Sequence, residues 1–80
     1  MHEVGLMQQA VEIALKHGSA GGAERITRVR MKVGALSGVE PNALQFAFEV
    51  VTRGTMAQNA TLDIDAESGF DLRVASIEVE

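Results

Sequence analysis

Residues 25–34 read RITRVRMKVG, and this short stretch decides the fold class. Apolar side chains and cations alternate along it: Val29, Met31 and Val33 against Arg28, Arg30 and Lys32. Such alternation predicts a β-strand with one face buried and the other in water. The three cations are either a stripe that binds phosphate or partners for carboxylates nearby, and the net charge of −4 favours the second interpretation.

Helical patterns lie on both sides of this strand. Residues 3–17 carry apolar residues at helical spacing, and Gly18 is the expected end of that helix. A second helix is predicted to start at Pro41, with Glu40 near its positive end, and to end at Gly54. Because it is apolar over much of its circumference, including Phe46, we expect it to be the most buried element.

Two further strands follow, TLDIDA at residues 61–66 and DLRVASIEVE at residues 71–80. The alternation of the last strand slips by one residue at Ala75–Ser76, which predicts a β-bulge there. The order α-β-α-β-β predicts an α+β fold in which two helices pack on a small three-stranded sheet. A strand–helix–strand crossover followed by a hairpin accounts for this order, and residues 1–80 are expected to form a single domain.

The connection ESGF at residues 67–70 sets the pairing of the last two strands. We expect an antiparallel hairpin in which Gly69 takes a positive φ. Its core-facing side chains are expected to be Leu62, Ile64, Ala66, Leu72 and Val74. Phe70 has no obvious core to enter. If four residues cannot turn the chain without strain, the last strand is expected to pair with a second molecule in a domain-swapped dimer.

Composition narrows the function classes. The chain has no cysteine, so it offers no disulfide and no thiolate metal site. No apolar run approaches the ~18 residues of a membrane span, and no leader is recognisable, so we expect a cytoplasmic protein with no membrane contact. The acidic charge and the absence of Trp and Tyr argue against a nucleic-acid partner. No nucleophile–base set or phosphate loop is found, so no enzyme activity is expected.

The opening residues Met1, His2 and Glu3 form a candidate metal site. The α-amine, the His2 amide nitrogen and the His2 imidazole can close adjacent chelate rings around one ion. A planar set of nitrogens suits Ni(II) or Cu(II), and Glu3 can add its carboxylate or its amide. A solvated terminus without any ligand role is the alternative from these residues alone.

The stretches MHEVGLMQQAVEIAL at residues 1–15 and RVRMKVGALSGVEPNALQFAFEVVTRGT at residues 28–55 resemble the HypA/HybF family of nickel metallochaperones, which serve hydrogenase maturation. The ending DLRVASIEVE resembles the final strand of that family. The resemblance implies that Ni(II) binds through His2, with Met1 and Glu3 contributing. It also implies a HypB-like GTPase partner and delivery of nickel towards the hydrogenase large subunit.

One departure from the family is plain. Members carry a zinc domain with two Cys-x-x-Cys pairs, expected between about residues 66 and 71, where this chain has only AESGFD. No zinc is therefore expected in this chain, and delivery to the hydrogenase is placed in doubt. We favour an engineered deletion over a naturally shortened relative. The alternative function is a metal-free interaction module that docks a GTPase or associates with itself.

Overall fold

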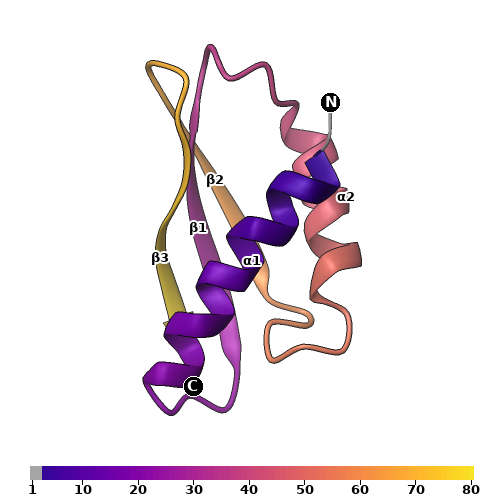
Figure 1. Ribbon diagram of the computed structural model, residues 1–80, viewed down its shortest axis with the longest axis vertical. Coiled ribbons are helices and arrows are strands. Elements are labelled where there is room, and N and C mark those ends of the chain that lie inside the picture. The colour runs from indigo at the N-terminus through magenta and orange to yellow at the C-terminus, as the bar shows by residue number, and fades with distance from the viewer. Residues whose placement is uncertain (1–2) are drawn as a thin grey trace.

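The computed structural model describes residues 3–80, which form two helices and three strands. The elements in chain order are α1 (Glu3–Ala20), β1 (Ile26–Gly34), α2 (Pro41–Thr52), β2 (Thr61–Glu67) and β3 (Leu72–Val79). α1 crosses the face of the sheet and α2 lies beside it, and the two helices pack against each other (Figure 1). The expected α+β class and element order are confirmed. None of the helices described is long and apolar enough to cross a membrane.

The strand order is β2-β1-β3, with β1 in the centre. β2 runs parallel to β1, pairing Val29 with Leu62, and β3 runs antiparallel to it, pairing Val29 with Ile77. The expected hairpin between the last two strands is therefore wrong, although β3 does lie in the sheet of its own chain. The central position of β1 is favourable for two reasons. Its apolar side chains are flanked by a strand on each side, and its cations lie beside carboxylates of both neighbouring strands.

The predicted β-bulge is confirmed. Arg30 pairs with Ser76 and Met31 pairs with Val74, which leaves Ala75 as the extra residue of β3. A second irregularity leaves Thr27 without a residue opposite it in the β3 register, and the sequence pattern did not indicate it. The bulge at Ala75 restores the apolar residues on both sides of it to the helix-covered face.

The core lies between the sheet and the two helices. β3 contributes only the partly buried Leu72, Val74 and Ile77. The fully buried side chains come from the other four elements and the loop before β2: Met7, Ala10, Val11, Ala14, Ile26, Val29, Met31, Val33, Leu44, Ala47, Phe48, Ala57 and Leu62. The expectation that α2 is the most buried element is wrong, because Phe46 is 66% exposed whereas all the apolar side chains of β1 are buried. A helix at the surface of a two-layer fold keeps one side in water, whereas a central strand is flanked on both sides.

Gly18 does not end α1, which continues to Ala20. Gly18 is buried, and a Cβ atom there would lie 3.0 Å from the Sδ atom of Met56 and 3.1 Å from the Cδ1 atom of Ile26. The glycine therefore serves close packing within the helix. On β2, Leu62 is buried as expected, but Ala66 is exposed near the end of the strand.

The β2–β3 connection, residues 68–71, passes over the end of β1. The amide N–H groups of Gly34 and Leu36 donate to the carbonyl oxygens of Asp71 and Gly69, at 2.6 and 2.8 Å. Gly69 has the expected positive φ, at 98°, and Phe70 is 73% exposed, as its lack of a core implied. The connection has to cross β1 because β2 and β3 lie on opposite sides of it.

Candidate functional site

The predicted metal site lies at the start of α1, and the structure places one of its three residues. Glu3 is the first residue of α1 and is partly buried. Met1 and His2 lie outside the described residues. The first amide N–H groups of a helix have no partner within it, so the Glu3 amide is not needed for the hydrogen bonds of α1.

Packing fixes the helix that begins at Glu3. Met7, Val11 and Ala14 recur at helical spacing and are almost completely buried against the sheet and α2. An apolar stripe of this kind holds a helix by tertiary contacts along its length. The residue that follows His2 therefore belongs to a well-anchored element.

His17, the other histidine, cannot join this site. It is exposed in the last turn of α1, fourteen positions beyond Glu3, which corresponds to about 21 Å along a helix axis. Within residues 3–80, no three His, Asp or Glu side chains gather closely enough to hold a metal ion. The chain contains no cysteine, so its residues do not fit the thiolate zinc centre of the family.

The outer face of the sheet carries a network of ion pairs. Arg28 Nη1 lies 2.6 Å from Asp63 Oδ2, and Arg28 Nε lies 3.5 Å from Glu78 Oε1. Lys32 Nζ lies 3.8 Å from Asp65 Oδ2 on the same face. The cations of β1 therefore pair with carboxylates of the neighbouring strands, as the acidic net charge favoured.

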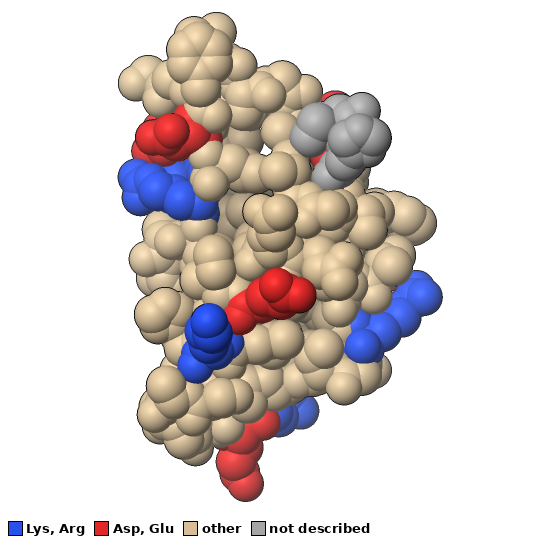
Figure 2. All heavy atoms as spheres, in the orientation of Figure 1, with Lys and Arg blue, Asp and Glu red and all other residues tan. Residues whose placement is uncertain are grey.

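The ion pair between Arg28 and Asp63 shifts the pKa values of both groups. The hydrogen bond from Arg28 lowers the pKa of the Asp63 carboxyl group, and the positive charge of Arg28 adds to that effect. The same hydrogen bond raises the pKa of Arg28. By contrast, most of the surface on the helix side of the molecule is uncharged (Figure 2).

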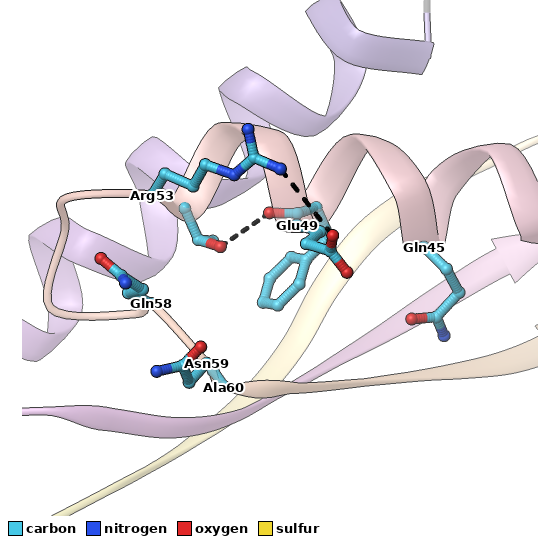
Figure 3. Close-up of a pocket in the computed structure, with 8 residues that line it drawn as sticks. Gln45, Glu49, Arg53, Gln58, Asn59 and Ala60 are labelled. Atoms are coloured by element: carbon cyan, nitrogen blue, oxygen red, sulfur yellow. Dashed lines mark hydrogen bonds and ion pairs between the residues drawn. The ribbon is translucent and has the colours of Figure 1, made fainter.

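A polar cleft of about 490 Å³ lies between α2 and the segment that precedes β2. Gln45 and Glu49 line it from α2, Arg53 from the position directly after that helix, and Gln58 and Asn59 from the segment (Figure 3). The Gln58 side chain accepts a hydrogen bond of 2.8 Å from the Gly54 amide, which closes this loop. This cleft could not be predicted from the sequence, because amide side chains in a loop give no distinctive pattern. It offers hydrogen bonds but no nucleophile with an adjacent base.

Comparison with protein families identifies the class of protein to which this chain belongs. A family model described as "Hydrogenase/urease nickel incorporation, metallochaperone, hypA" matches residues 1–72. The class is therefore that of the nickel metallochaperones. The chain belongs to the HypA family, as the resemblance of its motifs indicated.

Individual relatives agree with this assignment. The chain is 45% identical over 69 residues to the hydrogenase maturation factor HypA of Rhizobium leguminosarum bv. viciae, covering 86% of this chain and 61% of that protein. It is 50% identical over 64 residues to the HypA of Klebsiella pneumoniae subsp. pneumoniae, covering 80% of this chain and 56% of that one. The chain thus spans about three fifths of the length of these relatives.

The fold also matches a solved structure. The solution structure of the nickel metallochaperone HypA from Helicobacter pylori superposes with a TM-score of 0.84 at 18% sequence identity. The alignment covers 99% of this chain and 97% of the other. At this low identity the likeness establishes the shared fold alone.

Proposed function

We propose that this chain is a nickel-binding metallochaperone domain that captures Ni(II) at its amino terminus. The observation that carries the proposal is the family match over residues 1–72, which includes Met1, His2 and Glu3. The ligands are the α-amine, the His2 amide and imidazole nitrogens, and either the amide or the carboxylate of Glu3. Nickel is the cargo of this domain and not a permanent part of its fold.

The position of Glu3 supports this ligand set. Because the amide N–H groups of the first turn have no partner within the helix, a metal can replace an amide proton there without breaking a hydrogen bond of α1. The positive end of the helix dipole opposes a cation. The Glu3 carboxylate, in the first turn, offsets that field.

We further propose that residues 1–80 act as a single domain without a zinc domain and pass nickel to a HypB-like GTPase. The family assignment supports this partner. Delivery to a hydrogenase large subunit is the less supported step, because the short β2–β3 connection occupies the place where the family carries its zinc domain. The chain spans about three fifths of its relatives, and functions of their remaining part do not transfer to it.

The test is a titration of Ni(II) into the untagged chain, followed by the visible absorption of a planar nitrogen site. We expect one nickel per chain, loss of this binding in His2→Ala, and an unchanged circular-dichroism spectrum. His17→Ala is the matched control, since it removes the other imidazole about 21 Å away along α1. Nickel binding by His2→Ala that equals that of the parent would contradict the proposal.

A second measurement separates the amine from the imidazole. A chain extended by a few residues before Met1 should bind nickel more weakly, because its α-amine has become an amide. Acidification from about pH 7 to pH 5 should release the metal, because a ligating imidazole nitrogen must be unprotonated to bind. Full affinity of the extended chain would remove the amine from the ligand set.

A further inference from the structure

The outer edge of β3 is available for pairing with another strand. β3 pairs with β1 on one side, and within residues 3–80 no strand pairs with its other side. It lies at the border of the sheet, away from α2 (Figure 1). Unpaired backbone groups along such an edge are a template for the addition of another strand.

The sequence of β3 is complementary to itself when reversed. If two copies of LRVASIEV run antiparallel about a two-fold axis between Ala75 and Ser76, the residues directly opposite each other are Leu72 with Val79, Arg73 with Glu78, and Val74 with Ile77. Each dimer then has two pairs of opposite charge on its outer face and four apolar pairs on its helix face. Cross-strand pairs of both kinds stabilise a sheet.

The bulge is compatible with this register. Because both copies carry the extra residue Ala75 at the two-fold axis, the spacing from Val74 to Ile77 is the same in the two strands. The backbone groups of one strand that are placed for hydrogen bonding can therefore lie opposite those of the other strand on both sides of the axis. A bulge in only one of the strands would break this match.

The other edge of the sheet lacks this complementarity. The charged side chains of β2 are Asp63, Asp65 and Glu67, all of them negative. Two β2 edges brought together would oppose carboxylates to carboxylates, which destabilises a strand pair. Charge therefore selects β3 over β2 as the edge that a second copy can join.

A groove beside β3 extends the contact. Its volume is about 230 Å³, and its lining includes Ile13 of α1 together with Val74 and Ile77 of β3. Ile13 is 49% exposed and Val79 is 48% exposed. A stable interface buries about 800 Å² on each partner, roughly one sixth of the 4862 Å² surface of this chain, so a dimer needs this groove as well as the strand edge.

We propose that two copies of this chain associate through β3, antiparallel and in the register that opposes Arg73 to Glu78. The result is a two-fold dimer with one continuous sheet and the Ile13 side of each α1 facing its partner. This contact leaves β3 in the sheet of its own chain, unlike a domain swap. It does not depend on nickel.

Sedimentation velocity over roughly a hundredfold range of concentration tests the proposal through charge reversal. Arg73→Glu opposes two carboxylates at each end of the contact, and Glu78→Arg opposes two cations. We expect each single variant to weaken dimerisation roughly tenfold or more, and the double variant Arg73→Glu/Glu78→Arg to restore it. Restoration is specific, because only this register places residue 73 opposite residue 78.

Arg53→Glu is the matched control. It changes the net charge by the same amount as Arg73→Glu and breaks an exposed ion pair with Glu49, but it lies directly after α2 and not on β3. Its dimerisation should equal that of the parent, and circular dichroism should show every variant folded. A parent that is monomeric throughout, a dimer that is indifferent to both reversals, or a double variant that stays monomeric would overturn the proposal.

Discussion

Replacing Gly34 with alanine should destabilise the fold through a backbone collision. Gly34 ends β1, directly beneath the β2–β3 connection, and it is buried. A Cβ atom there would meet the carbonyl oxygen of Gly69 and would lie 2.7 Å from its carbonyl carbon and 2.9 Å from the amide nitrogen of Asp71. These are backbone atoms, so no side chain can rotate away to relieve the contact.

The size of the effect follows from the two ways of relieving the collision. If the connection stays in place, the overpacking costs about 1–3 kcal/mol. If it moves away, hydrogen bonds from Gly34, Ala35 and Leu36 are weakened, each contributing about 1 kcal/mol. Alanine also restricts the conformations of the unfolded chain, which stabilises the folded state by about 0.4–1 kcal/mol. The free energy of unfolding should therefore fall by about 0.5–2.5 kcal/mol, and the melting temperature by roughly 2–20 °C.

Urea and thermal unfolding followed by circular dichroism measure this loss. Gly21→Ala is the matched control, because a Cβ atom there would meet the carbonyl oxygen of His17 only at an ordinary contact distance of 3.5 Å. Gly21 and Gly34 both lack a positive φ, so alanine is conformationally tolerated at both positions. A Gly34→Ala variant as stable as Gly21→Ala would refute the close approach of the connection to β1.

Three other predictions concern stability. Glu40→Ala should lower the free energy of unfolding by about 1 kcal/mol in urea titrations, because the Glu40 carboxylate accepts hydrogen bonds of 3.1 Å from two amide N–H groups of the first turn of α2. Leu44→Ala, at a completely buried position, should cost about 2–5 kcal/mol by the same assay. The pKa of Asp63 is lowered in the folded state, so its pair with Arg28 stabilises the fold above the pKa of the unfolded state, near 3.9, and this contribution is lost as the pH falls through the folded-state pKa. Asp63→Asn should therefore flatten the fall in stability below about pH 4, and an unchanged acid profile would show that the pair contributes nothing.

The elements of this fold could be predicted from sequence because each has a clear period. The alternation around Val29 and the slip at Ala75 identify strands and a bulge from local geometry alone. The order of the strands could not be obtained in this way, because a short connection such as residues 67–70 favours a hairpin locally. The position of β1 in the centre depends on pairing between distant segments, where its cations meet Asp63 and Glu78 from opposite sides.

Burial and the candidate site also depend on contacts between distant segments, which a local sequence pattern does not give. Phe46 was one of the residues from which α2 was expected to be the most buried element, but burial on α2 depends on which side of the helix meets the sheet, and composition does not give that direction. Gly18 was expected to end α1, yet its role is set by Met56 and Ile26, which are distant in sequence. Of the metal site, the motif could be recognised from Met1, His2 and Glu3, and its ligation stays a prediction.

The central position of β1 has a consequence for folding during synthesis. β1 is complete at Gly34, but its two neighbours end at Glu67 and Val79. At about 5–20 residues per second, a ribosome needs roughly 2–9 s to add the 45 residues from Gly34 to Val79. The edge of this most buried strand that pairs with β2 has no partner until Glu67 has been added, and the edge that pairs with β3 has none until Val79. Nascent chains stalled before β3 should therefore be the form of this domain that chaperones hold and proteases cut.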